Sequence, residues 1–418
     1  MPLDCRTVFF RQGRTAVALI SLDLCAISDR LTAEIQEAVS SRMKDPPHLV
    51  LNCSHSHEAP FLAQFETDPV SRTYEVQVVS SVVDSVLKAA SSLAPATARF
   101  AEKTVEGLNR NRRKKDHPVD RSLSLVSIEM TSGEPIALLW RFSAHPIVHQ
   151  NLEHDWTPDF PGITNRILES RHGCHCQYLQ GICGDAFPLD WYFGQEHPRY
   201  PTSGESERFM GESLAGHLDG LLGSALPMAL SPLLWNEQEI RLEARTFPWA
   251  LEEARRRLEE LEPRQDDRQY VPWGPQDHVV NLAQHNELRY QILALRLLLG
   301  VTGRKQQGFR CSLTAVRLGD LFVAAVPGEM FCPEGLELAR HHPVHPTFVL
   351  NCTNGYVFYI PSPPDAAEVA DWDLDNFLDQ KRNRWAYGAT ITTYVAPDSA
   401  TRIVAALRSQ LHRLTADG

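Results

Sequence analysis

The order of strand-like and helical segments most constrains the fold of this chain. Apolar runs such as Thr15–Ile27 and His48–Asn52 predict buried strands, whereas Leu31–Met43 and Ser71–Ser92 have the three- and four-residue spacing of helices. The two kinds of segment neither alternate strictly nor repeat along the chain. We therefore predict an α/β (mixed α+β) fold, in which mixed β-sheets are flanked by helices.

Later segments continue the mixed pattern. Residues 123–142 and 311–326 each predict a hairpin, because two apolar runs flank a short polar turn. The charged stretch near 262–278 predicts an exposed loop. No compositional break marks a domain boundary, so residues 1–418 are predicted to form one large domain. Helical spacing is also found in Glu205–Leu222, Leu251–Leu261, Val279–Leu299 and Ser399–Leu414.

Composition excludes several classes of function. Asp and Glu outnumber Lys and Arg by 52 to 41, which argues against general nucleic-acid binding. The one basic run, residues 110–115, is interpreted mostly as a solvated loop. The chain has no long apolar segment that predicts a membrane span and no basic-then-apolar leader. Its nine scattered cysteines do not suggest a disulfide framework. We therefore expect a cytoplasmic protein.

The tripeptide His55-Ser56-His57 follows the predicted strand His48–Asn52 directly. In an extended backbone, residues i and i+2 point to the same side, so these two imidazoles are able to converge on one point. Imidazole is the commonest metal-binding side chain and suits zinc well. The alternative interpretation is a pair of polar residues in a surface turn.

Three further residues, His145, Glu329 and Tyr359, also stand just beyond predicted strands. Side chains that are distant in sequence but share strand ends are typical of a catalytic site in a layered domain. Each also has a structural alternative. His145 precedes a proline and fits a turn, Glu329 fits the acidic start of a helix, and Tyr359 fits an ordinary strand.

Several short motifs occur in a fixed order along nearly the whole chain. They are Cys53–Pro60, Asn109-Arg110, Val119–Leu125, Ala144–Val148, Asp159–Gly162, Gly184–Pro188, Pro327–Glu329 and Tyr356–Ile360. In order and spacing they resemble the motifs of the catalytic domain of the neutral (non-lysosomal) ceramidases and their shorter bacterial relatives. No single motif is decisive, but the ordered set is specific.

The resemblance implies one zinc ion with four ligands: His55, His145, Glu329 and Tyr359. It places His57 beside the metal as a substrate-contacting or proton-handling residue, and Arg110 opposite the oxygen that becomes negative. Zinc polarises a carbonyl group and lowers the pKa of a bound water to about 7. Losing one donor to the developing oxyanion typically costs about 100-fold in rate.

The chain departs from the family pattern at several positions. Phe187 stands where the family has a serine, so an acyl-serine route through that position is excluded. Glu58-Ala59 replaces Ser-Gly after the histidine pair, which makes Glu58 either an acid–base group or a solvent-facing residue. Phe187, Tyr356 and Trp385 are predicted to contact the substrate. The chain is also expected to lack the family's C-terminal sandwich domain.

We therefore predict a zinc-dependent hydrolase of an amide bond, with an ester as second choice, in a small soluble acyl compound. Metal-activated water would attack, and His57 or Glu58 would move the proton. Two alternatives remain open: a non-catalytic binding member of the family, and a metal-dependent biosynthetic enzyme that transfers an acyl group or closes a ring. An amidohydrolase barrel is disfavoured because eight regular strand–helix units are not found. The sequence leaves open whether the chain forms a homo-oligomer.

Overall fold

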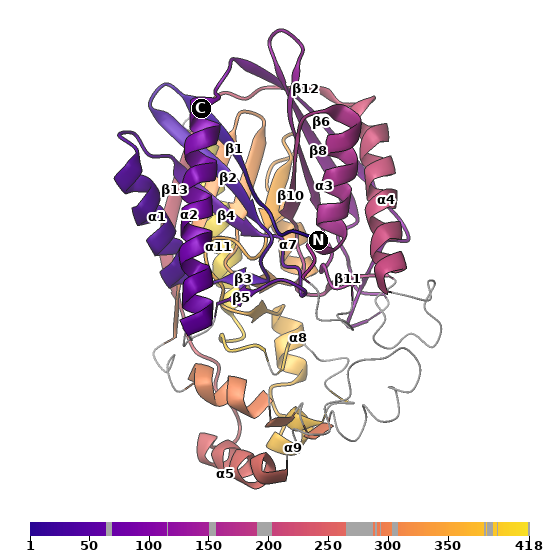
Figure 1. The fold of residues 1–418 in the computed structure, drawn as a ribbon. Helices are drawn as coiled ribbons and strands as arrows, with labels where there is room; N and C mark the ends of the chain where they lie inside the picture. The colour runs from indigo at the N-terminus through magenta and orange to yellow at the C-terminus, as the bar shows by residue number, and fades with distance from the viewer. Residues whose placement is uncertain are drawn as a thin grey trace.

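The computed structural model confirms a mixed α and β architecture, with sheets inside and helices outside (Figure 1). It describes residues 1–63, 69–114, 116–149, 156–189, 203–264, 287–288, 291–292, 294–302, 308–379, 382, 388–390 and 392–416. Most of the predicted exposed loop near 262–278, and much of the predicted helix Val279–Leu299, lie outside the described residues.

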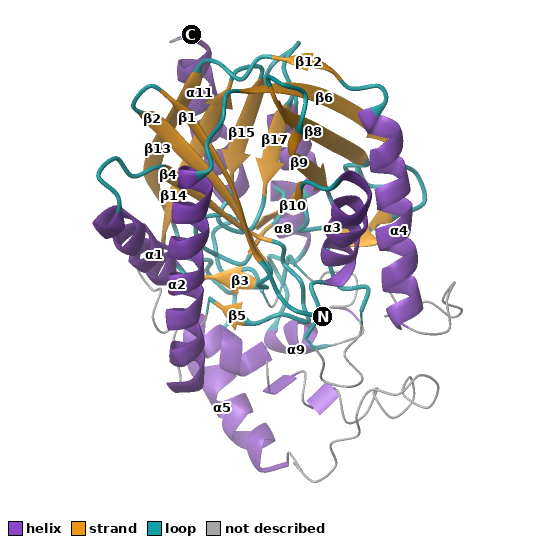
Figure 2. Ribbon diagram, turned by 45° about the horizontal axis from the view of Figure 1, so that its top comes forward, coloured by secondary structure: helices purple, strands orange, loops and turns teal. Residues whose placement is uncertain are grey.

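Three larger sheets form the interior (Figure 2). The first has the order β1 (Cys5–Gln12), β2 (Thr15–Leu22) and β4 (His48–Cys53). The second has the order β10 (His175–Gln180), β9 (Pro135–Phe142), β8 (Ser122–Met130), β6 (Ala96–Thr104) and β12 (Leu226–Met228). The third has the order β13 (Leu233–Leu242), β14 (Phe309–Leu318), β15 (Leu321–Ala325) and β17 (Thr347–Leu350). Each sheet is open and contains one parallel pair, so the described chain forms no barrel.

Helices cover the outer faces of these sheets (Figure 2). Helices α1 (Asp29–Arg42) and α2 (Pro69–Ser91) pack on the first sheet, and α3 (Asp159–His172) and α4 (Ser203–Leu222) pack on the second. Helices α7 (Cys332–Ala339) and α11 (Ser399–Ala416) pack on the third. Other helices are α5 (Leu251–Leu261), η1 (Glu262–Arg264), α8 (Pro363–Glu368) and α9 (Leu374–Leu378). No helix in the described part of the chain is long and apolar enough to cross a bilayer.

Strand β2 shows why the sequence has unbroken apolar runs. Val17 and Leu19 face the core between the sheets, whereas Ala18 and Ile20 face α1 and α2. A strand that is buried on both faces needs apolar residues at every position rather than at alternate ones. The prediction of one strand over Thr15–Ile27 is wrong, because the backbone turns after Leu22 and resumes as the short β3 (Ala26–Ile27).

Three small two-stranded sheets lie beyond the ends of the larger ones. They pair β3 with β5 (Phe61–Leu62), β7 (Asn109–Asn111) with β11 (Ala186–Pro188), and β16 (Glu329–Met330) with β18 (Tyr359–Ile360). Their residues include several of the sequence motifs, so these short pairings bring the motifs together.

Candidate metal centre

The loop after β4 turns His55 inward. His55 adopts a left-handed backbone conformation with φ of 65°, which is uncommon for a residue other than glycine. Its backbone N–H donates to the Leu24 carbonyl at 3.0 Å, and its Nδ1–H donates to the Cys25 carbonyl at 2.6 Å. These bonds hold the buried ring so that Nε2 is the nitrogen available to a ligand, which is the arrangement expected of a metal-binding histidine.

His145 is held in the same way after β9. Its backbone N–H donates to the Ala186 carbonyl at 3.0 Å, and its Nδ1 lies 3.3 Å from the same oxygen. The short β16–β18 pairing places Glu329 directly beside Tyr359. All of these side chains are buried, so the four predicted ligands lie together on the inside of the protein.

The ligand atoms of the four residues surround one point. His145 Nε2 lies 2.9 Å from Glu329 Oε2 and 3.2 Å from the Tyr359 hydroxyl, and His55 Nε2 lies 3.5 Å from Glu329 Oε1. Donor atoms about 2.0–2.2 Å from a tetrahedral ion lie about 3.3–3.6 Å from one another. The observed separations are close to that spacing.

Two buried atoms support a cation at this point. His55 Nε2 and Glu329 Oε2 make no hydrogen bond of acceptable geometry, although both are fully enclosed. A buried polar atom without a well-formed hydrogen bond is costly, and a cation within reach of both atoms would satisfy them. With two imidazoles, a carboxylate and a phenol, the donor set is one that zinc accepts, so the residues fit a divalent metal.

The charges in the site also favour a bound cation. Burial raises the pKa of Glu329, but the neighbouring His55 and His145 outweigh it and hold that pKa well below its usual value. Burial likewise lowers the pKa of His55, but the Glu329 charge reverses the effect and raises it. Burial lowers the pKa of His145, and Glu329 only partly offsets this. The site therefore holds an ionised carboxylate that needs a positive charge beside it.

His57 lies beside this group, and Glu58 follows it in the chain. The His57 ring is edge-on to that of His55, with ring centres 5.0 Å apart, and the residue is exposed. Desolvation by the surrounding protein, together with His55 and His145, lowers the pKa of His57. Glu58 is half-buried, and it adds a small effect to the hydrogen bond with Glu207 that raises the pKa of His149. The proton-handling roles of His57 and Glu58 stay predictions.

Phe187 and two arginines form a second wall of the site. In the β7–β11 pairing, Arg110 lies directly opposite Phe187. The Phe187 ring stacks on His145, with ring centres 4.2 Å apart, while the Arg112 guanidinium lies 4.5 Å from the centre of the Phe187 ring. The Arg112 charge also lowers the pKa of His145 and His57. Sequence analysis missed Arg112, which lies just after the end of β7 and two positions after Arg110.

Tyr356 and Trp385 were also predicted to contact the substrate. The Tyr356 hydroxyl donates to Glu329 Oε1, so Tyr356 orients the carboxylate of a predicted ligand. Trp385 lies outside the described residues. The substrate-binding roles of Phe187, Tyr356 and Trp385 stay predictions.

Two buried asparagines that sequence analysis did not select hold the strand ends in place. Asn52 Nδ2 donates to the Asn351 carbonyl at 2.8 Å, and Asn52 Oδ1 accepts from the Gln180 backbone at 2.7 Å. Asn351 Nδ2 in turn donates to the Met330 carbonyl at 3.0 Å. These bonds join β4, β10 and β17 next to the site. The signal was present, since both asparagines belong to the repeated segment Val-Leu-Asn-Cys followed by Ser or Thr.

The fold of this chain was compared with solved protein structures. A ceramidase solved in complex with C2 superimposes with a TM-score of 0.68 at 13% identity, covering 97% of this chain and 68% of that one. The neutral ceramidase of Pseudomonas aeruginosa gives a TM-score of 0.67 at 15% identity, covering 94% of this chain and 66% of that one. This chain shares the fold of neutral ceramidases. It spans about two thirds of their length, and no family model matches its sequence.

A glycine under the Tyr359 ring gives a test of the site. Gly388 has φ of +84°, and a Cβ atom there would lie 2.7 Å from Tyr359 Cδ1. We expect Gly388→Ala to displace the Tyr359 ring and to weaken zinc binding by about 10–100-fold, the usual cost of disturbing a group that positions a ligand. Competition with a chromogenic chelator measures the affinity.

Gly216→Ala is the matched control, because a Cβ atom added at this position in the middle of α4 would meet nothing within 4 Å. We expect it to bind zinc like the wild type. Equal zinc affinity in Gly388→Ala would show that the Tyr359 position does not matter for the metal.

Proposed function

We propose that this protein is a zinc-dependent hydrolase that cleaves an amide bond in a small soluble acyl compound. The observation that carries the proposal is the convergence of His55 Nε2, His145 Nε2, Glu329 and Tyr359 around one buried point. The neutral ceramidase fold supports it, since the ceramidases that share this fold are named for the cleavage of an amide. We propose the same reaction class for this chain, without assigning it the same substrate.

The chain's own side chains supply the remaining chemistry. A divalent cation, when bound, polarises a carbonyl group and lowers the pKa of a water molecule. In this proposal His57, exposed beside the ligand group, accepts the proton of the attacking water and returns it to the departing amine. Arg110 and Arg112 bring positive charge to the side of the site where the carbonyl oxygen becomes negative.

Phe187 favours one rival function. A phenyl ring stacked on His145 offers no hydroxyl nucleophile, so a non-catalytic binding protein that lost turnover with the family serine would carry the same residue. In that case the protein would bind acyl amides without releasing an amine. The hydrolase proposal requires only water as the nucleophile, and Phe187 leaves that route intact.

Metal removal tests the proposal. Purified protein is incubated with short-chain N-acyl amines and N-acyl amino acids, and released primary amine is quantified before chelation, after chelation and after zinc is returned. We expect release to disappear with the chelator and to return with zinc, because the chain's residues alone supply no Lewis acid. Binding of the same compounds with no amine released in any state would support the binding protein instead.

Substituting the two arginines then identifies the residue that faces the oxyanion. We expect Arg112→Met to lower kcat by about 100-fold, the typical cost of losing one donor to the developing charge, because its guanidinium charge acts on both His57 and His145. Arg110→Met tests the residue that the family resemblance selected. Arg256→Met, on the exposed face of α5, is the control, and we expect it to keep wild-type kcat. An unchanged kcat in both Arg110→Met and Arg112→Met would exclude an oxyanion role for either guanidinium.

A further inference from the structure

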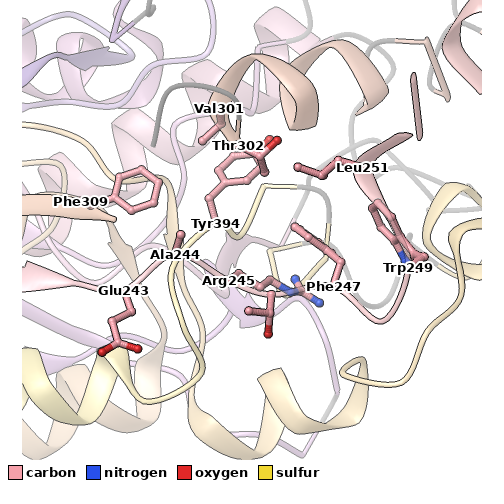
Figure 3. Close-up of a pocket in the computed structure, with 11 residues that line it drawn as sticks. Glu243, Ala244, Arg245, Phe247, Trp249, Leu251, Val301, Thr302, Phe309 and Tyr394 are labelled. Atoms are coloured by element: carbon pink, nitrogen blue, oxygen red, sulfur yellow. The ribbon is translucent and has the colours of Figure 1, made fainter. Parts of the chain in front are cut away.

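A cavity that shares no lining residue with the candidate metal ligands is drawn in Figure 3. Its volume is about 520 Å³, within the range typical of small-molecule sites. Its walls come from residues 243–251, from Val301 and Thr302, and from Phe309 and Tyr394. The Tyr394 ring packs edge-on against Phe358, with ring centres 4.9 Å apart, and Phe358 directly precedes the candidate ligand Tyr359 in the chain.

The positive charge in this cavity is the guanidinium of Arg245. Its Nη1 donates to the carbonyl oxygens of Ala389 and Thr390 at 2.9 and 3.1 Å, and both acceptors are neutral. Among the described residues, no carboxylate oxygen lies within 4.0 Å of Arg245. Burial lowers the pKa of Arg245 to about 10, and Tyr394 only partly offsets this. Figure 3 shows the Glu243 carboxylate beyond Ala244, pointing away from the Arg245 guanidinium.

The surfaces next to this charge are aromatic. The rings of Phe247 and Trp249 stack with centres 4.7 Å apart, and the Arg245 guanidinium lies 5.1 Å from the centre of the Phe247 ring. A partly buried cation beside apolar walls favours a ligand with one negative group and an apolar body. A neutral ligand would leave the charge uncompensated, and a cationic ligand would be repelled.

We propose that this cavity binds a small organic monocarboxylate, whose carboxylate pairs with Arg245 and whose apolar body lies against Phe247 and Trp249. The planar guanidinium suits a carboxylate because two parallel N–H groups match its two oxygens. The site does not depend on the proposed hydrolysis. The two are chemically related, however, since cleavage of an acyl amide releases a carboxylate of this class.

Calorimetric titration of the full-length protein with octanoate tests the site, and octanamide is the neutral probe of nearly equal shape. We expect the wild type to bind octanoate at least about 10-fold more tightly than octanamide. Arg245→Gln removes the charge but keeps a donor for the Ala389 and Thr390 carbonyls. We expect it to weaken octanoate binding about 10-fold or more, since a hydrogen bond to a charged group contributes about 1.5–3 kcal/mol, and to leave octanamide binding unchanged.

Two further variants separate this site from the metal centre. Thr302→Trp adds an indole to the cavity from a lining residue other than Arg245, and we expect it to weaken binding of both probes. Glu329→Gln alters the candidate metal centre, and we expect it to leave octanoate binding within twofold of wild type. The proposal is overturned if octanoate does not saturate the wild type, if Arg245→Gln binds it normally, or if only Glu329→Gln removes binding. Calorimetry measures binding and needs no turnover. Octanoate binding would therefore be detected even if the protein did not hydrolyse amides.

Discussion

Replacing Glu329 with alanine is expected to leave the purified protein with almost no zinc. Its carboxylate lies between the two imidazoles, 2.9 Å from His145 Nε2 and 3.5 Å from His55 Nε2, and supplies a negative charge for the cation. Disturbing a group that only orients a ligand costs about 10–100-fold in metal affinity, so losing the ligand itself should cost more. Metal analysis by mass spectrometry after dialysis measures the loss.

Glu337→Ala is the matched control, because it removes a carboxylate from the exposed surface of α7, where Glu337 pairs with Arg408. We expect the control to keep its zinc and its stability, since exposed ion pairs contribute little. His55→Ala should behave like Glu329→Ala. Undiminished zinc in both His55→Ala and Glu329→Ala would rule out this group of residues as the metal centre.

Replacing Arg141 with methionine should be the most damaging single change to stability. Arg141 Nη1 donates to Asp120 Oδ2 at 2.7 Å, and both side chains are almost completely buried. The same carboxylate accepts from the Ser143 hydroxyl at 2.7 Å, two residues before His145. Removing one partner leaves the other charge buried and unpaired, which typically costs about 3–5 kcal/mol. Urea unfolding followed by circular dichroism measures the loss.

The stability lost in Arg141→Met is expected to depend on pH through the protonation of Asp120. Burial raises the pKa of Asp120, but Arg141 and Ser143 outweigh it, so the folded pKa lies below the unfolded one. The ionised carboxylate therefore stabilises the wild type above the unfolded pKa of about 3.9, and this contribution is lost as the pH falls through the folded pKa. In Arg141→Met, burial has no opposing charge and raises that pKa. We therefore expect the penalty to be full near neutral pH and to shrink in acid, where Asp120 is protonated.

Arg256→Met serves as control for this measurement as well. Its side chain is 73% exposed and lies 4.0 Å from Glu260, so we expect a loss below about 1 kcal/mol. An Asp120→Asn, Arg141→Met double variant should recover part of the stability, because it leaves no unpaired charge. Equal losses in the buried and exposed variants would contradict the role given to burial.

Local patterns in the sequence predicted the larger elements well. The hairpin of β8 and β9 and the hairpin of β14 and β15 lie where turn residues separate two apolar runs. Helix α1 begins at a serine whose hydroxyl accepts from the Leu31 backbone, and its buried residues recur at helical spacing. Strands β1 and β6 were not predicted. The short pairings β7–β11 and β16–β18 were missed because two or three residues carry too little periodicity.

The sequence alone determined the mixed fold class and the chemical types of the candidate ligands, because apolar spacing and donor atoms are local properties of residues. The family resemblance already grouped the four ligands, but only the tertiary structure decided which other side chains contact them. Arg112 beside Phe187, Tyr356 on Glu329 and the Asn52 bonds across three sheets all join segments far apart in the chain. Such contacts depend on how sheets pack against one another, and no local pattern records that packing.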